Sequence, residues 1–216
     1  MLSLTVMPAA AAAGAFNQYF ERDIDAKMKR THKRSAASGE LNHNEVFMVG
    51  MVISILGMGW AFIIAPLYGL VVFAGWFFDV VVYTLWLKRR TAWSIVWGGI
   101  SGGMPILAGR VLGVGGFDWI EVILSLGILF WIPTHILTFS MKYYNDYKAA
   151  GVPTFPSTYG FGFTRAVIAI SSVIAALAMG MAGWGIGMTV GYLRILIVLS
   201  AGLLTLAVAT LLRPSE

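Results

Sequence analysis

Long runs of apolar residues, separated by short polar segments, dominate the chain from end to end. A helix needs about 20 apolar residues to cross a hydrocarbon core of about 30 Å. The runs lack the strict apolar–polar alternation of a membrane β-barrel, so we expect helices. The pattern predicts an all-α, polytopic transmembrane bundle that forms a single membrane-embedded domain over residues 1–216. The seven predicted spans cover residues 1–20, 46–65, 67–87, 92–111, 118–141, 163–183 and 189–212.

Composition supports a membrane protein and excludes several other classes. The chain is 58% hydrophobic and 12% charged, whereas a soluble domain is about 45–50% apolar and about 25% charged. So few charges cannot coat a surface in water, which excludes a soluble globular enzyme and a disordered chain. They also argue against a nucleic-acid partner, despite a pI near 9.6. The absence of cysteine excludes disulfides and thiolate chemistry.

The distribution of cations predicts the orientation of the spans. If the first span ends on the inner side, only Arg110 and Arg194 of the 15 Lys and Arg residues fall on the outer side. Such an asymmetry is the positive-inside pattern of membrane proteins. We therefore expect a multi-pass protein of a bacterial or archaeal cell membrane, with its cation-rich loops on the cytoplasmic side.

The first inner loop carries an acidic ridge. Residues four apart on a helix lie on nearly the same face, so Asn17, Glu21 and Asp25 should line up at the inner end of the first span. Two carboxylates and an amide suit Mg²⁺, which commonly binds one or two carboxylates together with substrate phosphates. The nearby Lys29 and Arg30 could hold phosphate oxygens. The alternative is a solvated helix end, but acids that emerge directly from an apolar helix are costly and favour a functional role.

The second inner loop contains three consecutive cations, Lys88, Arg89 and Arg90. Cations at the inner end of a span commonly serve only as membrane anchors. If these cations face the acidic ridge, they gain a second use as clamps for a diphosphate.

The third inner loop repeats this chemistry with one acid, Asp146, between Lys142 and Lys148. His135 lies about two turns deeper and could be a packed hydrogen-bonding residue, a base, a polar substrate contact or a haem ligand. Asp79 lies inside a span, where it could be functional or could hydrogen-bond a neighbouring helix. Its depth separates it from the loops, so we do not assign it to the metal.

These motifs resemble those of a known family. The spacing Asn17-x₃-Glu21-x₃-Asp25 is similar to the first acidic motif of the UbiA-type intramembrane prenyltransferases. Five longer strings, in collinear order, resemble the branch of that family that farnesylates protoheme IX. These strings are NQYFERDIDAKMKRT, YTLWLKRRT, IVWGGISGGMP, WIPTH and NDYKAAGVPTFP.

The resemblance implies a nine-helix bundle and a specific reaction. Farnesyl diphosphate, bound with Mg²⁺, would transfer its farnesyl group to a vinyl group of haem b, and water would add to the same group to give haem O. By motif position, the metal ligands would be Asn17, Glu21, Asp25 and Asp146. The diphosphate-binding residues would be Lys29, Arg30, Lys88, Arg89, Lys142 and Lys148. The catalytic residues would be Asp25, Asp146, Tyr147 and His135, with Tyr83 and Tyr147 beside the allylic cation and His135 beside the porphyrin.

The chain departs from the family pattern in three ways. Glu21 stands where Asp is usual, and Asn145-Asp146 stands where a pair of acids is common. Relative to the family, we expect the chain to lack about one helix at each end, which would leave the acceptor pocket incomplete. Other hypotheses are a prenyltransferase with a quinone-type aromatic acceptor, a transporter and a non-catalytic assembly protein. A transporter would place its polar clusters at the bilayer midplane rather than at one face.

Overall fold

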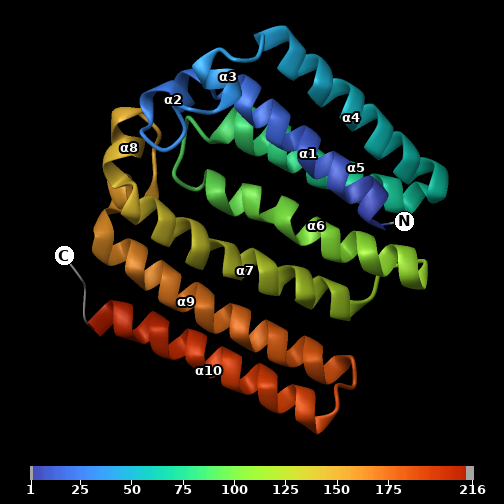
Figure 1. The fold of residues 1–216 in the computed structure, drawn as a ribbon. Helices are drawn as coiled ribbons and strands as arrows, with labels where there is room; N and C mark the ends of the chain where they lie inside the picture. Colours follow the sequence, from blue (N-terminus) through green and yellow to red (C-terminus); the bar gives the residue numbers. More distant parts are fainter. Residues whose placement is uncertain (1, 213–216) are drawn as a thin grey trace.

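The computed structural model describes residues 2–212, and this range contains helices and loops but no strand. The helices lie side by side and run alternately in opposite directions (Figure 1). The long helices are α1 (Leu2–Phe20), α4 (His43–Ile64), α5 (Pro66–Phe77), its π-helical continuation η1 (Phe78–Leu87), α6 (Ser94–Val114), α7 (Trp119–Lys142), α9 (Phe155–Gly185) and α10 (Val190–Leu212). The short helices are α2 (Arg22–Lys27), α3 (Ser35–Ser38) and α8 (Tyr144–Ala149).

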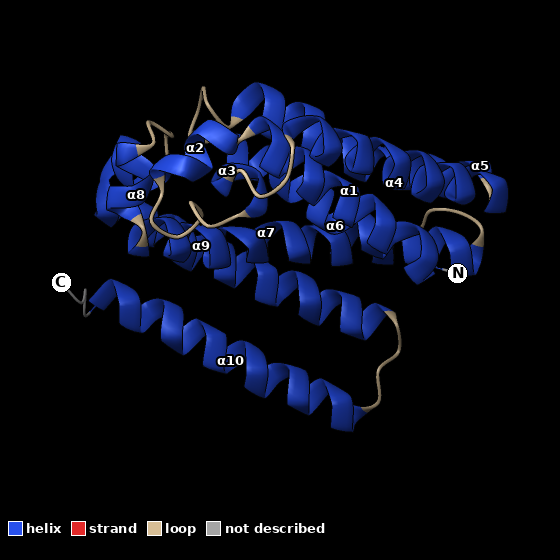
Figure 2. Cartoon of the chain, turned by 45° about the horizontal axis from the view of Figure 1, so that its top comes forward, coloured by secondary structure: helices blue, strands red, loops and turns tan. Residues whose placement is uncertain are grey.

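Neighbouring helices in the sequence are mostly neighbours in space. The pairs α1·α4, α5·α6, α6·α7, α7·α9 and α9·α10 form the main contacts. The short helices α2, α3 and α8 gather at one end of the bundle in both ribbon views (Figures 1 and 2). The loops predicted on the inner side therefore meet at this end, which we call the inner end.

Five segments are long and apolar enough to cross a membrane, and the bundle has the architecture of an integral membrane protein. They are His43–Ile64, Pro66–Leu87, Ser94–Val114, Trp119–Lys142 and Phe155–Gly185. The other two predicted spans are also helical, as α1 and α10. In α1 the polar residues Asn17 and Gln18 occupy the last turn, and in α10 the apolar stretch covers Val190–Leu206. Arg213, which the charge pattern assigns to the inner side, lies outside the described residues.

Two helices begin with polar caps. At the start of α4, the Asn42 side chain accepts a hydrogen bond from the Asn44 backbone N–H, and Glu45 accepts one from the Asn42 backbone N–H. Thr154 and Ser157 make a similar arrangement at the start of α9, but Gly160 (φ 83°, ψ 166°) breaks the helical backbone after the first turn, so the continuous helix of α9 begins close to the predicted residue 163. Such reciprocal caps satisfy backbone donors that the first turn leaves free. The apolar pattern alone placed the start of α4 a few residues too late.

Small residues allow the helices to approach closely. A Cβ atom at Gly57 would lie 3.1 Å from Pro8, and a Cβ atom at Gly103 would lie 3.1 Å from Ser125. Small residues at contacts are the usual means of tight helix association in membranes, where apolar burial adds little. A hydrogen bond between the Thr5 and Tyr68 hydroxyls links α1 to α5 in the same region.

The π-helix η1 is a local structure that the sequence pattern did not predict. Its backbone bonds run five residues back, as in the 2.9 Å bond from the Lys88 N–H to the Tyr83 carbonyl. Asp79 and Lys88 are nine residues apart, which is about two and a half turns of an α-helix and would place them on opposite faces. At about 4.4 residues per π-helical turn, the same spacing is about two turns. The two side chains therefore share one face of η1.

Candidate functional site

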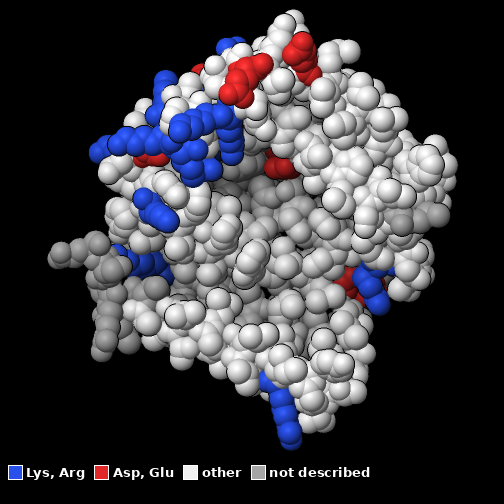
Figure 3. Space-filling model, viewed as in Figure 1, with Lys and Arg blue, Asp and Glu red and all other residues white. Residues whose placement is uncertain are grey.

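Three inner segments converge at the inner end of the bundle. Ile24 and Met28 of the first segment pack against Ala150 and Val152, which follow α8, and Tyr147 joins this contact. Lys and Arg side chains gather over the same end of the molecule (Figure 3). The structure thus brings together the first and third predicted motifs through an apolar contact.

The acidic ridge continues across the break between α1 and α2. The Glu21 N–H donates to the Asn17 carbonyl at 2.9 Å, and the Asp25 N–H donates to the Glu21 carbonyl at 2.8 Å. These bonds carry the four-residue repeat across the junction between α1 and α2. Glu21 and Asp25 are each only 3% exposed. The Asn17 amide donates to the Thr84 hydroxyl at 3.5 Å, which ties the ridge to η1.

Each ridge carboxylate has a cation beside it. Lys88 Nζ lies 2.5 Å from Glu21 Oε1. The Arg34 guanidinium donates to both oxygens of Asp25, at 2.9 and 3.2 Å. A buried carboxylate without a partner would be strongly destabilising, so these cations make the buried ridge possible.

The electrostatics of the Glu21–Lys88 pair reflect its burial. Loss of solvation raises the pKa of Glu21, and the neighbouring Lys88 opposes this rise. Burial also disfavours the charged form of Lys88, but the attraction of Tyr83 and Glu21 outweighs that cost and raises the lysine pKa. The Lys88 ammonium lies 5.2 Å from the centre of the Tyr83 ring. Lys88 therefore stays charged at the base of the ridge.

The ridge fits an open Mg²⁺ site rather than a closed one. Among residues 2–212, no group of three or more His, Asp or Glu side chains is close enough to hold a metal ion. Asn17, Glu21 and Asp25 nevertheless supply one amide and two carboxylates, the donor set that Mg²⁺ uses when phosphates and water complete its shell. A metal with a diphosphate would compete with Lys88 and Arg34 for the carboxylates, and the phosphates would offer those cations new partners.

Arg89 is held by an acid outside the ridge. Its guanidinium donates to the two Asp23 oxygens at 2.8 and 2.6 Å and to the Phe20 carbonyl at 2.8 Å. The hydrogen bond from Arg89 lowers the pKa of Asp23, which is largely exposed. Asp23 therefore pairs with Arg89 and does not belong to the ridge. Arg89, a predicted diphosphate ligand, ties the turn after η1 to α2.

Four predicted phosphate ligands form an exposed cationic group. Arg30 lies over the rings of Phe139 and Tyr143, at 4.9 and 5.7 Å from their centres. Lys142 and Lys148 lie 5.5 and 5.7 Å from the rings of Tyr143 and Tyr144. Within residues 2–212 no carboxylate is paired with these cations. The group, which we call the exposed cations, consists of Lys29, Arg30, Lys142 and Lys148.

The tyrosines predicted beside the allylic cation share a small cavity. Tyr83 and Tyr147 line a space of about 40 Å³ together with Lys88. Tyr83 can pack closely because its ring covers Gly98, where a Cβ atom would lie only 2.9 Å from the ring. Asp146 lies in the first turn of α8, half-buried, next to Tyr147.

His135 is exposed on α7 rather than packed inside the bundle. Its ring stacks on Trp131 with centres 5.9 Å apart and an angle of 6° between the planes. Phe139 lies one turn further along the same face, 6.4 Å from the His135 ring. Trp131, His135 and Phe139 therefore form an aromatic stripe on α7.

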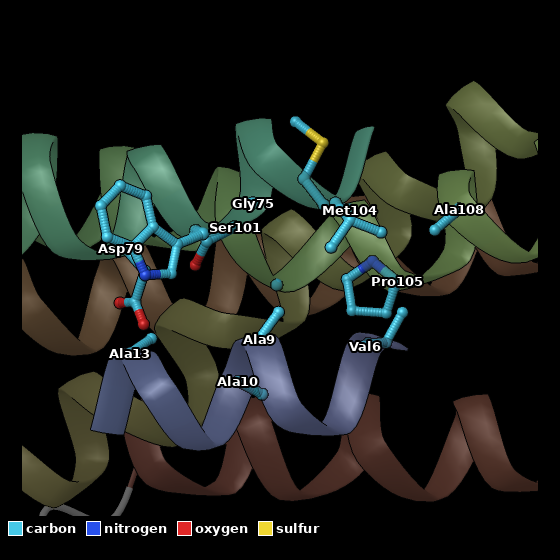
Figure 4. A pocket seen from close by; sticks show the side chains of 13 residues that line it. Val6, Ala9, Ala10, Ala13, Gly75, Asp79, Ser101, Met104, Pro105 and Ala108 are labelled. Carbon is cyan, nitrogen blue, oxygen red and sulfur yellow. The ribbon is translucent and has the colours of Figure 1, made fainter. Parts of the chain in front are cut away.

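A larger cavity of about 240 Å³ lies between α1, α5–η1 and α6 (Figure 4). Its walls are mainly apolar and include Ala9, Ala13 and Met104. Asp79 lies at one end of the cavity, whereas Val6 and Ala108 lie towards the other end (Figure 4). This cavity could not be predicted from the sequence, because its lining residues come from α1, α5–η1 and α6, which meet only in the folded bundle.

Comparison with known proteins identifies the family. The sequence pattern of the UbiA prenyltransferase family matches residues 1–216. The chain belongs to this family. It is similar to protoheme IX farnesyltransferases from Pyrobaculum arsenaticum, with 42% identity over 176 residues, 81% of this chain and 63% of the relative. The relative of the same description from Archaeoglobus fulgidus is 39% identical over 199 residues, 92% of this chain and 70% of the relative.

A solved UbiA homologue has the same fold. The structure of a UbiA homologue from Archaeoglobus fulgidus bound to DMAPP and Mg²⁺ superposes with a TM-score of 0.76, covering 98% of this chain and 73% of the homologue. Because the two sequences are only 15% identical, this likeness shows a shared fold and nothing more. This UbiA-family chain spans about 60% of the length of the curated relatives it matches first.

The structure adds two residues to the site that the motifs did not single out. Arg34 holds Asp25, and Thr84 accepts from Asn17. Arg34 reaches Asp25 because the chain turns after α2, where the Thr31 hydroxyl donates to the Asp25 carbonyl at 3.1 Å. The only sequence signal for Arg34 is its place among the inner-loop cations, which does not reveal which acid it meets.

Proposed function

We propose that this UbiA-family chain catalyses Mg²⁺-dependent transfer of a farnesyl group from farnesyl diphosphate to a vinyl group of haem b, giving haem O. The observation that carries the proposal is the buried ridge of Glu21 and Asp25, each beside a cation, at the point where three inner segments meet. The names of the relatives favour the haem acceptor over a quinone. The UbiA homologue bound to DMAPP and Mg²⁺ supports the donor and the metal.

In this proposal the ridge holds the diphosphate end of the donor. Asn17, Glu21 and Asp25 would hold Mg²⁺ from one side, and Asp146 of α8 would hold it from the other. The bound metal supplies positive charge to the departing diphosphate. Lys88 lies closest to the ridge and would bind phosphate oxygens directly. The exposed cations would draw the anionic substrate to the inner end and hold its outer oxygens. Arg89 would join them only if its pair with Asp23 opened.

Bond formation would take place deeper in the bundle. As the C1–O bond of farnesyl diphosphate breaks, positive charge develops on the allylic carbons, and the rings of Tyr83 and Tyr147 present polarisable faces to it. The surrounding apolar helices keep bulk water from this cation. The vinyl group of haem b would then attack C1, with His135 on the porphyrin side.

The orientation in the membrane follows from the charges. We propose that the inner end faces the cytoplasm of a bacterial or archaeal cell, where the water-soluble diphosphate end of the donor can enter. The farnesyl chain and the haem acceptor would reach the site through the membrane lipid that surrounds the bundle.

The test compares two neighbouring carboxylates on α2. The protein in lipid nanodiscs is supplied with haem b, farnesyl diphosphate and Mg²⁺, and diphosphate release and product mass are measured. We expect Asp25→Asn to lower diphosphate release by about a hundredfold or more, because it removes a ridge ligand. The matched control is Asp23→Asn, which removes an equal charge two residues away, outside the ridge, and should retain most activity.

Three results would contradict the proposal. Equal losses in the two variants would show that α2 needs only its net charge. Turnover that does not depend on Mg²⁺ would show that the reaction does not use the metal. A prenylated quinone in place of a haem product, in the same assay with both acceptors present, would reassign the acceptor.

A further inference from the structure

Asp79 places an acid at the end of the 240 Å³ cavity. Within residues 2–212 its carboxyl group has no hydrogen-bond or ion-pair partner, and Figure 4 shows it directed towards Ala13 of α1. Two other polar groups line the same cavity. The Trp76 indole N–H is buried and has no hydrogen-bond partner, and the Ser101 hydroxyl donates to the Gly98 carbonyl at 2.6 Å. An acid and an unused donor in an otherwise apolar space require a functional explanation.

The π-helix aligns this acid with the diphosphate site. Asp79, Tyr83 and Lys88 follow one another on the same face of η1, about two π-helical turns from end to end. Lys88 extends towards Tyr83, with its ammonium 5.2 Å from the ring centre, and the charges of Asp79 and Lys88 interact. A cation suited to a departing diphosphate therefore lies at one end of this face, and an acid suited to accepting a proton lies at the other.

The cavity is suited to one water molecule beside the acid. A buried water needs two to four polar partners, and the Asp79 carboxyl, the Trp76 N–H and the Ser101 hydroxyl oxygen are three polar groups on residues that line this cavity. The remaining walls are apolar, so they do not support a chain of waters that could reach the allylic cation. A single held water is what a hydration step needs when the preceding step must stay dry.

We propose that Asp79 is the base that accepts a proton from the water that adds to the vinyl group of the acceptor. This inference rests on the proposed function, in which the product carries both a farnesyl chain and a hydroxyl group. It gives a role to the acid that the diphosphate site leaves unused.

The step balances without a further reactant. The terminal vinyl carbon forms a bond to C1 of the farnesyl group as the C1–O bond to diphosphate breaks, which leaves a positive charge on the vinyl carbon next to the porphyrin. The water oxygen bonds to that carbon and one of its protons passes to the Asp79 carboxylate. If no base assists the water, the same cation can lose a proton from the neighbouring carbon and become an alkene that is lighter by one water.

The experiment measures product composition rather than rate alone. The protein in nanodiscs is incubated with haem b, farnesyl diphosphate and Mg²⁺, and mass spectrometry gives the ratio of alkene to hydroxylated farnesyl-haem. We expect Asp79→Asn to keep diphosphate release but to raise this ratio by about tenfold or more, since base assistance is commonly worth at least this much. Trp76→Phe should raise the ratio less, because it removes only the group that orients the water. Met104→Leu changes an apolar wall of the same cavity and should leave the ratio unchanged.

The outcomes separate this inference from the proposed function. If the unmodified protein forms no farnesylated haem, the proposed function fails. If it forms hydroxylated product and Asp79→Asn gives the same ratio, or loses both products in parallel, Asp79 is not the base. If Asp79→Asn does not assemble, Trp76→Phe decides: a raised ratio supports the water site, and an unchanged ratio overturns it.

Discussion

The two ends of the bundle both carry ion pairs, but they are built differently. At the outer end Arg110 contacts Asp118, and its Nε lies 3.5 Å from Glu121 Oε2. Asp118 also caps α7 by accepting from the backbone N–H groups of Ile120 and Glu121, at 2.9 and 3.1 Å. At the inner end Arg89 and Asp23 are 66 residues apart in the chain, whereas Arg110 and Asp118 are separated by eight.

This difference separates a structural use of charge from a functional one. The outer cluster joins two consecutive helices, contains more acids than cations and uses its acids to cap a helix, so it is complete in itself. The inner end buries two acids beside cations and adds the exposed cations, which have no acid partner within residues 2–212. Three of them, Arg30, Lys142 and Lys148, lie over aromatic rings. A group of cations without acid partners is what an anionic substrate would need, and in the described part of the chain such a group lies at the inner end.

The largest expected effect comes from removing Lys88. Lys88→Met takes away the cation nearest the ridge and should lower diphosphate release by about a hundredfold or more. It also leaves Glu21 buried without its partner, which should destabilise the protein. The double variant Glu21→Gln/Lys88→Met removes both charges and should recover thermal stability but not turnover. The control is Arg90→Gln, which removes an exposed cation two residues away. Recovery of turnover in the double variant would contradict the role of Lys88 in binding the diphosphate.

Arg34 should compete with the metal for Asp25. In Arg34→Gln the carboxylate is left for Mg²⁺ alone, so the Mg²⁺ concentration at half-maximal activity should fall by about two- to fivefold, the size of one partly exposed ion pair. A Mg²⁺ titration of diphosphate release measures this shift. Lys33→Gln removes a neighbouring exposed cation and should not shift the titration. A rise in the required Mg²⁺ for Arg34→Gln would mean that Arg34 helps to hold the metal site open.

Arg110 should matter for stability and not for catalysis. Glu121 is fully buried, so Arg110→Gln leaves its carboxylate without a cation and should lower the melting temperature. Activity per folded molecule should stay within about twofold, because the outer cluster lies at the opposite end of the bundle from the ridge. Arg194→Gln removes another outer-end cation and should change neither quantity. A large loss of activity in folded Arg110→Gln protein would contradict the purely structural role of the outer cluster.

The smallest expected effect is a change in acid stability at the outer end. The hydrogen bond from Arg110 lowers the pKa of Asp118 below its ordinary value of 3.8. The unfolded chain therefore binds this proton more readily than the folded protein, and the stabilising contribution is present above pH 3.8 and lost as the pH falls through the folded-state value. Asp118→Asn should flatten the dependence of melting temperature on pH in this range. The same variant should leave the dependence of diphosphate release on Mg²⁺ unchanged, and a change there would couple the two ends.

Much of the architecture could be predicted from local sequence. Apolar runs identified the long helices, and the four-residue repeat of Asn17, Glu21 and Asp25 placed these residues on one ridge. Caps such as Asn42 with Glu45 moved helix starts by a few residues, because side-chain hydrogen bonds outweigh the apolar pattern at the first turn. The pairing of Arg89 with Asp23 could not be predicted because it joins segments that meet only in the folded bundle.

The sequence by itself determined a membrane bundle and the acids of the ridge, and its charges predict a sidedness. These features depend on hydropathy and helical periodicity, which act over one or two turns of the chain. Only the tertiary structure decided that Lys88 meets Glu21, that Arg34 meets Asp25 and that a cavity opens beside Asp79. The physical reason is that these contacts join segments far apart in the sequence, and that residues 78–87 fit an α-helix or a π-helix in the sequence pattern, whereas the folded chain adopts the π-helix. That choice turns Asp79 from the face opposite Lys88 to the same face.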